Sequence, residues 1–246
     1  MTIMDSPGKT DGRPQHGLPS DAPRFSPALF WAGIAAICIV VAALSWTVMR
    51  SMQRQHAPLS SLPKLYRVTS DLKVLNRSGE TVHLSSLRGK VHTVAHLYTV
   101  CPHGCAAVVG EMLKLQKKFG SHPDFHQVSV TVLPERDTVD VLDAYARGIG
   151  LEADAPWWFV TGDRTAIWMY MMEALRLAPP EAIPKDEQLN PLDTHTHDLR
   201  IVLIDREGYV RGYYAVFHPQ AEVARLMCDK LQTDAEKLLR DVQGQD

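Results

Sequence analysis

The sequence predicts an α/β sandwich with a mixed sheet, preceded by a single N-terminal transmembrane helix. From residue 63 onward, short β-rich runs alternate with runs of helical spacing, which is the pattern of strands packed against helices. A long apolar stretch precedes this region and is a candidate membrane span. The third observation is a pair of cysteines placed between one of the strands and the helix that follows it.

Composition limits the class of protein. The chain has 246 residues, of which 45% are hydrophobic and 22% charged, so it can bury a core and is not wholly disordered. It has 26 basic and 28 acidic residues, a net charge of -2, so we expect no nucleic-acid partner. Four cysteines are too few for a disulfide scaffold, but they are enough for one redox pair or one metal site.

The apolar stretch predicts a membrane anchor over residues 25–50. No charged residue occurs between Arg24 and Arg50, and a span needs about 20 apolar residues. Trp31 and Trp46 lie near its two ends, where aromatic side chains meet the lipid headgroups. A cleaved signal peptide is the alternative, but the run exceeds the ~7–15 residues of a signal core. Basic residues are nearly balanced on the two sides, so charge does not assign the orientation.

The anchor divides the chain into four parts. Residues 1–24 are rich in Pro, Gly, Ser and Asp and predict a disordered tail. Residues 51–62 are interpreted as a linker between the anchor and the soluble domain, which we expect to span residues 63–246.

Within the soluble domain, the strands are expected where β-branched or aromatic runs lie between turn residues. These runs are 72–75, 81–84, 91–98, 128–132, 157–160, 199–204 and 209–214. Helices are expected where apolar residues recur every three or four positions. These segments are 106–119, 138–147, 164–177 and 218–239, the last in one or two pieces. Turn residues at 76–79 and 205–208 predict two hairpins, and Gly120 is placed to end the first helix.

The segment Cys101-Pro-His-Gly-Cys105 carries the chemistry. It lies between the 91–98 strand and the 106–119 helix, and the free N–H groups of a helix N-terminus stabilise a thiolate. The spacing brings both sulfurs to one side, so the pair can form a disulfide or bind a soft ion such as Cu(I). Two inert buried cysteines are the alternative. This placement makes a thioredoxin-like fold the first candidate.

Two other metal sites fit less well. A c-type haem is excluded in its usual form, because Ala106 stands where that motif has histidine. Zinc needs more ligands than one cysteine pair supplies.

Other soft side chains are interpreted as packing. Cys38 lies within the apolar run, and Cys228 occupies an apolar position of the last expected helix. Met169, Met171 and Met172 resemble a copper-handling group, but their place on an expected helix favours a role in filling the core.

A third ligand is sought among the histidines. His195 and His197 are alternate residues before a strand, so in an extended segment both side chains point to one side. A polar loop without metal explains the same spacing equally well. His103, between the two cysteines, is interpreted as an exposed bystander.

Four segments resemble the Sco/SenC family, the membrane-anchored copper chaperones of cytochrome c oxidase assembly. The segment LRGK (87–90) is similar to the family's lead-in to a strand, and YTVCPHGC (98–105) resembles its Cys-Pro-x-x-Cys motif. The segment PERDT (134–138) resembles its Asp-Pro-x-Arg-Asp-Thr stretch. His197 precedes LIDREG (203–208), as the family's histidine precedes its Leu-Ile-Asp-x-x-Gly hairpin. The likeness covers about residues 66–240.

The resemblance implies that Cys101, Cys105 and His197 bind a copper ion. It also implies a periplasmic domain on the cell inner membrane, an N-terminus inside, and lipid contact through the anchor. The client would be a copper-receiving protein such as a cytochrome oxidase subunit, with delivery to the binuclear copper site of subunit II. The alternative is an enzyme, an extracytoplasmic thiol–disulfide reductase in which Cys101 attacks and Cys105 resolves. A peroxide-reducing relative is a third, weaker option.

The chain departs from the family pattern at several positions. Ala106 replaces a second proline, Leu133 replaces an aspartate, and His103 is an unusual imidazole between the cysteines. The Pro-rich segment 178–194 has no clear counterpart. These departures keep the three ligands and leave the client open.

Overall fold

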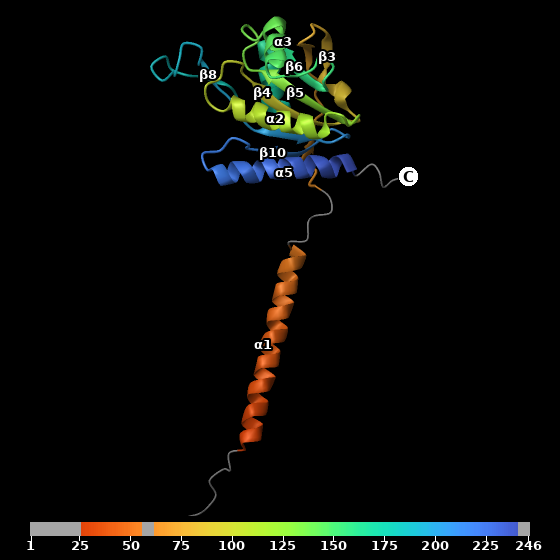
Figure 1. Cartoon of the computed structure of the whole chain (residues 1–246), viewed down its shortest axis with the longest axis vertical. Coiled ribbons are helices and arrows are strands. Elements are labelled where there is room, and N and C mark those ends of the chain that lie inside the picture. The colour runs from red at the N-terminus through yellow and green to blue at the C-terminus, as the bar shows by residue number, and fades with distance from the viewer. Residues whose placement is uncertain (1–25, 56–61, 241–246) are drawn as a thin grey trace, which may run out of the picture. The chain divides into compact units, whose positions relative to one another are not determined.

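The computed structural model describes residues 26–55 and 62–240, and the chain divides into two units, residues 1–60 and 61–246. Helix α1 (Pro27–Gln55) forms the described part of the first unit (Figure 1). Its stretch Pro27–Arg50 is long and apolar enough to cross a membrane. The expected tail lies outside the described residues, as does half of the expected linker (56–61), whose first residues continue α1.

The second unit alternates strands and helices, as the sequence predicts. Its strands are β1 (Tyr66–Arg67), β2 (Lys73–Asn76), β3 (Thr81–His83), β4 (Val91–Leu97), β5 (Phe125–Thr131), β6 (Trp157–Thr161), β7 (Glu181–Ala182), β8 (His195–Thr196), β9 (Ile201–Ile204) and β10 (Tyr209–Tyr214). Its helices are η1 (Leu84–Leu87, 3₁₀), α2 (Cys105–Phe119), α3 (Val139–Gly148), α4 (Arg164–Met169), η2 (Tyr170–Ala174, a π-helical turn) and α5 (Ala221–Arg240).

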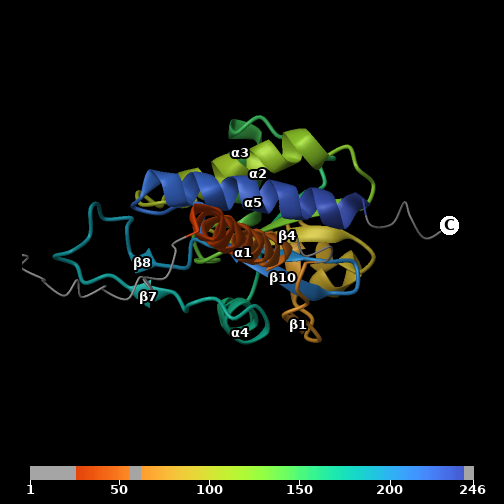
Figure 2. The same cartoon turned by 90° about the horizontal axis from the view of Figure 1, so that it is seen from below.

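Eight of these strands form one mixed sheet in the order β1-β10-β9-β4-β5-β6-β2-β3. The β4–β5 and β5–β6 pairs are parallel and the other pairs are antiparallel. Helices α2, α3 and α5 cover one face, and α4 lies on the other (Figure 2). Strands β4 and β5 are therefore covered on both faces, and every residue in them is buried.

The burial of β5 is more complete than its valine alternation predicts. Ser129 and Thr131, which occupy the intervening positions, are as buried as the valines. The Trp157 indole donates to the Ser129 hydroxyl at 3.0 Å, and the Thr131 hydroxyl donates to Asp137 at 2.7 Å. Because partners satisfy these polar groups, the second face of the strand can also be covered.

The expected helix 164–177 is shorter and less regular than its spacing suggests. Asp163 caps α4 by accepting from the Ala166 amide at 2.7 Å, and the α-helix ends at Met169. A π-turn follows, in which the Leu175 amide donates to the Tyr170 carbonyl at 3.2 Å. The final expected helix is a single element, α5.

Both expected hairpins are present as β2–β3 and β9–β10. In the second, the Asp205 carboxylate accepts from the Tyr209 amide at 2.8 Å and from Arg211 at 2.7 Å, and both charged side chains are buried. Arg211 also donates to the Pro63 carbonyl at 3.0 Å. This buried pair therefore ties the start of the domain to the last hairpin.

Candidate metal centre

The cysteine segment connects β4 to α2. The Cys101 amide donates to the Tyr98 carbonyl at 3.0 Å, and Cys105 is the first residue of α2 after the N-cap Gly104. A Cβ atom at Gly104 would lie 2.5 Å from the Leu199 side chain and 2.7 Å from that of Phe217, so any larger residue would require these side chains to move. This close approach brings the segment before β9 against the cysteine loop.

Three ligand atoms meet at this junction. The sulfurs of Cys101 and Cys105 and a ring nitrogen of His197 all lie within 4.8 Å of one another. The Cys105 Sγ–His197 Nε2 distance is 2.9 Å, and His197 Nδ1 lies 3.0 Å from the Asp198 carbonyl. Nδ1–H donates to that carbonyl, which leaves the Nε2 lone pair directed at the sulfurs.

The two thiols are electrostatically unequal. Hydrogen bonds from the Cys105 thiol and from the amides of Cys105 and His103 lower the pKa of Cys101 to about 3, although its burial opposes this. The pKa of Cys105 is raised, because its thiol donates to Cys101 and is itself buried. The thiolate therefore resides on Cys101, the more exposed of the two.

His195 and His197 line one pocket together with Cys101, His103 and Leu199, as expected for alternate residues of an extended segment. His195 is nevertheless outside the three-ligand group. Its ring lies 5.8 Å from that of Trp168, and the Thr194 hydroxyl lies 2.9 Å from its Nδ1. The structure thus separates two histidines that the spacing alone made equivalent.

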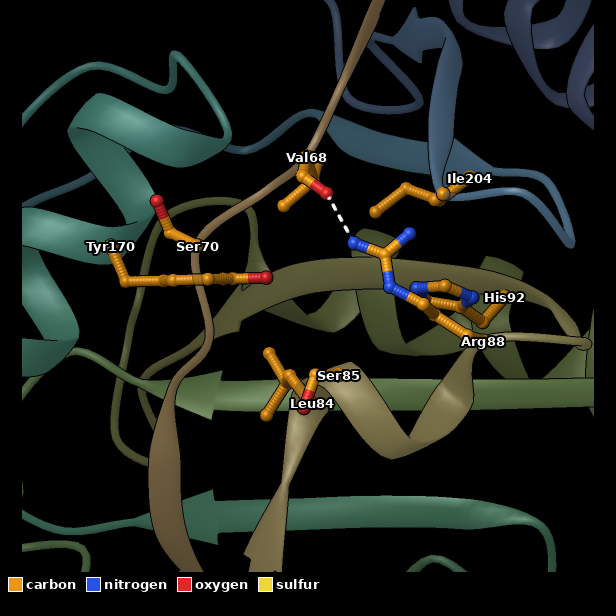
Figure 3. Close-up of a pocket in the computed structure, with 9 residues that line it drawn as sticks. Val68, Ser70, Leu84, Ser85, Arg88, His92, Tyr170 and Ile204 are labelled. Carbon is orange, nitrogen blue, oxygen red and sulfur yellow. Dashed lines mark hydrogen bonds between the residues drawn. The ribbon is translucent and has the colours of Figure 1, made fainter.

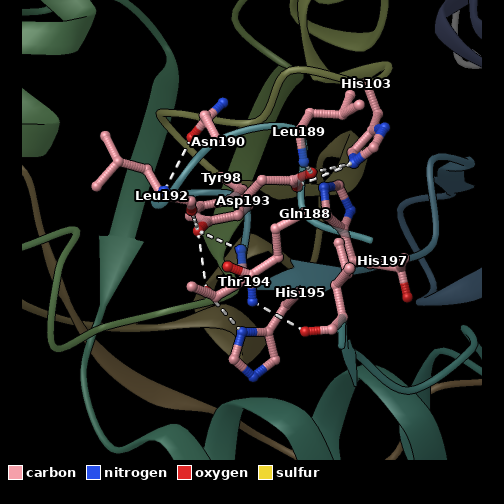
Figure 4. Close-up of polar contacts among 12 residues, drawn as sticks. Tyr98, His103, Gln188, Leu189, Asn190, Leu192, Asp193, Thr194, His195 and His197 are labelled. Atoms are coloured by element: carbon pink, nitrogen blue, oxygen red, sulfur yellow. Dashed lines mark hydrogen bonds and ion pairs between the residues drawn. The ribbon is translucent and has the colours of Figure 1, made fainter. Parts of the chain in front are cut away.

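The His103 side chain contacts a buried carboxylate. Its Nε2 lies 2.9 and 3.0 Å from the two carboxylate oxygens of Asp193, whose side chain is completely buried (Figure 4). The sequence interpretation as a bystander missed this contact, because Asp193 lies in the Pro-rich segment that the pattern leaves unassigned.

Asp137, within the PERDT segment, accepts hydrogen bonds that fix the chain just before the cysteine segment. It is fully buried and accepts from the Thr99 hydroxyl at 2.5 Å. It also accepts from the Thr131 hydroxyl at the end of β5 at 2.7 Å. The residue before the N-cap of α3 therefore anchors the chain two residues ahead of Cys101.

Of the three buried histidines that the sequence did not single out, two are without hydrogen-bond partners in the described part of the chain. His96 on β4 and His126 on β5 are 2% and 5% exposed, and among the described residues neither ring nitrogen of either histidine has a hydrogen-bond partner. The His96 ring lies 5.7 Å from that of His197, whereas His126 lies 4.5 Å from the Trp158 ring. Burial lowers the pKa of each to about 3, so both are neutral at pH 7.

The remaining soft side chains lie outside the three-ligand group. Met171 is fully buried, as expected for core filling, but the expectation is wrong for Met169 and Met172, which are 48% and 36% exposed. Their part of the chain leaves the α-helical path at the π-turn, so they do not all face the core. Cys228 is half-buried against the core and Cys38 is exposed on α1; all four cysteines are free thiols.

A second pocket, near the start of β4, is structural. It is lined by groups that include Tyr170, His92 and Arg88 (Figure 3). Arg88 donates to the Val68 carbonyl at 2.7 Å and to the Glu207 carbonyl at 3.0 Å. Its donors therefore hold the β1–β2 segment and the last hairpin together.

The fold and the site define a thioredoxin-like protein with a cysteine pair and one histidine at the end of the central strand. A sequence model of the SCO1/SenC family matches residues 61–232, and the chain belongs to this family.

Known proteins resemble this chain in sequence over part of its length and in fold. The SCO1 protein homolog of Bacillus subtilis (strain 168) is 34% identical over 88 residues, which are 35% of this chain and 45% of that relative's length. The crystal structure of a SCO1/SenC family lipoprotein from Bacillus anthracis str. Ames matches with a TM-score of 0.59 at 22% identity, over 72% of this chain and 99% of that chain.

BsSco, described as a member of the Sco family of cytochrome c oxidase assembly proteins with a disulfide switch, matches with a TM-score of 0.56. It is 25% identical, over 73% of this chain and 98% of that chain. Arabidopsis thaliana ScoI, whose structure has copper bound, matches with a TM-score of 0.51 at 18% identity, over 68% of this chain and 99% of that chain.

Proposed function

We propose that this protein is a membrane-anchored copper-binding chaperone. It receives copper at Cys101, Cys105 and His197 and passes it to a client such as the binuclear copper site of oxidase subunit II. The observation that carries the proposal is the convergence of two sulfurs and an Nε2 lone pair within 4.8 Å. Membership of the SCO1/SenC family supports it, as does the copper reported for the Arabidopsis relative.

The donor set suits the proposed cargo. Thiolates are soft ligands that favour Cu(I), and one added imidazole makes a three-coordinate site that also accepts Cu(II). Cys101 is already a thiolate, whereas Cys105 holds its proton through burial and its bond to Cys101. Metal binding therefore releases the Cys105 proton, because only the thiolate is a strong ligand.

The anchor and the site together suggest where the protein works. Helix α1 holds the chain at a membrane, and the domain that follows faces the periplasm in this proposal. Support for that side comes from the family resemblance and from the lipoprotein relative, not from the charges that flank α1.

The test is the removal of one ligand. In His197→Ala, retention of Cu(II) should fall more strongly than retention of Cu(I), because two thiolates still hold Cu(I). Copper per chain is measured after dialysis of the reduced protein. His195→Ala is the matched control, since it removes an imidazole from the same pocket but not from the ligand group. Copper loss in His195→Ala but not in His197→Ala would show that the ligand is assigned two residues too late.

A thiol–disulfide reductase is the second candidate, and the inequality of the two thiols favours it. A half-buried thiolate at Cys101 beside a buried thiol at Cys105 is the arrangement of an attacking and a resolving cysteine. His197→Ala separates the candidates, because the imidazole is not part of a Cys101–Cys105 disulfide. If neither histidine variant loses copper but either one slows reduction of a client disulfide, the reductase is the function.

A further inference from the structure

The third ligand lies on a different segment from the two thiols. After η2 the chain leaves the core, pairs β7 with β8 in a small ribbon, and returns through His197 to β9. The position of the imidazole relative to the sulfurs therefore depends on what fastens residues 187–197, called here the strap, to the cysteine segment.

Besides the Cys105–His197 contact, two side chains from the cysteine side reach the strap (Figure 4). The Tyr98 hydroxyl donates to the Leu192 carbonyl and lies 3.1 Å from the Thr194 hydroxyl. His103 Nε2 lies 2.9 and 3.0 Å from the Asp193 carboxylate oxygens. Of the two, only His103 lies between the cysteines, so its bond joins the thiol loop directly to the segment that carries the imidazole.

Burial makes the Asp193 contact consequential. The carboxylate is completely buried, and its other side-chain bond comes from the Leu189 amide at 3.1 Å, within the strap itself. Keeping a carboxylate buried after it has lost a hydrogen-bond donor costs free energy, so without His103 the Asp193 side chain will not remain in its buried position. The hydrogen bond does not require a charged His103, because the Nε2–H group of a neutral imidazole can donate to a carboxylate with the same geometry.

We propose that His103 is a positioning residue, which holds the strap so that His197 completes the copper site. Opening of this contact lets the His197 Nε2–copper bond break while both thiolates remain bound. A donor atom of the acceptor then takes the vacant coordination position, with no change in oxidation state. The inference rests on the proposed copper function.

The experiment compares full-length wild type, His103→Leu and His103→Gln in detergent, reduced and loaded with one equivalent of Cu(I). Leucine removes the donor, whereas glutamine keeps an N–H at similar reach. His83→Leu is the matched control, because His83 Nδ1 also bonds an aspartate, Asp71, at 2.6 Å but on the β2–β3 hairpin side. Three quantities are measured: amide exchange of the strap without metal, the X-ray absorption edge of Cu(I), and the rate of Cu(I) capture by bicinchoninate.

In His103→Leu we expect amide exchange in the strap and Cu(I) capture by bicinchoninate to become faster by a factor on the order of ten. This is the change in an equilibrium constant that the loss of one hydrogen bond to a charged group produces. The absorption edge should shift from three-coordinate towards two-coordinate Cu(I). His103→Gln should restore most of each property, and His83→Leu should match wild type.

Three results would overturn the inference. They are wild-type exchange in His103→Leu, faster exchange with an unchanged absorption edge, or a glutamine variant as fast as the leucine variant. A wild-type chain that takes up no copper would refute the proposed function, and this inference with it. A wild type that binds copper, paired with an unaltered His103→Leu, would refute only the role of His103.

Discussion

The buried histidines should make the domain sensitive to mild acid. His92, His96 and His126 are 7%, 2% and 5% exposed, and burial lowers their pKa values from 6.5 to about 4, 3 and 3. In the unfolded chain they take up protons below pH 6.5, but in the folded chain they cannot do so until about pH 4. The unfolded state then binds more protons, so the free energy of unfolding falls as pH falls through this window.

The size of the effect follows from the pKa differences. Between pH 7 and pH 5, each of these histidines should remove about 2 kcal/mol from the free energy of unfolding, and the three together about 5–6 kcal/mol. That is a large share of the ~5–15 kcal/mol that holds an ordinary domain together. Carboxylates contribute little above pH 5, because their ordinary pKa values lie near 4.

The assay is urea unfolding of the metal-free, reduced domain at pH 7, 6 and 5, followed by tryptophan fluorescence. His126→Phe should reduce the loss between pH 7 and pH 5 by about 2 kcal/mol, because phenylalanine fills the space beside Trp158 without a titratable group. His218→Ala, on a partly exposed loop residue, should leave the loss unchanged. A total loss under about 1 kcal/mol, or a full loss in His126→Phe, would refute the reasoning.

Three further predictions concern the reactivity of Cys101 and Cys228, the buried pair of Arg211 and Asp205, and the membrane anchor. The rate at which iodoacetamide alkylates Cys101 should change little between pH 6 and pH 8, because this thiol is already ionised. The rate at Cys228, whose pKa burial raises to about 11, should rise about ten-fold per pH unit. Peptide mapping measures the two rates separately, and a steep rise at Cys101 would contradict its assignment as the thiolate. Arg211→Met should lower the free energy of unfolding by about 3–5 kcal/mol, because Asp205 is left charged and buried, and the double variant with Asp205→Asn should lose less; equal losses would show that the pair is not the cause. Carbonate-washed membranes should retain the full-length chain through α1, whereas a shorter soluble species would identify residues 27–49 as a signal peptide.

The sequence predicts the main elements well where one local pattern determines them. The alternation at 128–132 locates β5, and the apolar spacing of 106–119 locates α2 to within one residue. The pattern cannot show that Ser129 and Thr131 are buried, because their partners Trp157 and Asp137 come from other elements. The π-turn after Met169 is equally invisible, since helical spacing does not distinguish i+4 from i+5 bonding over one turn.

The same distinction applies to the candidate site. The cysteine spacing identifies both thiols, because a strand-to-helix junction is a local feature. The choice between His195 and His197 is not local, since Trp168 lies against one ring and Cys105 against the other. The contact of His103 with Asp193 spans 90 residues, and no pattern within either segment encodes it.

The antiparallel pairing of β4 with β9 has a consequence for the order in which the protein matures. Cys105 and His197 are 92 residues apart, and His197 immediately precedes the segment that leads into β9. Contacts of such long range form late, after local helices and hairpins. A chain emerging from its amino end therefore exposes its two thiols well before the imidazole arrives, and passes through a stage in which only a thiol pair exists. All three donors come together only after β9 has paired with β4, so the number of ligands available at this site indicates whether folding is complete.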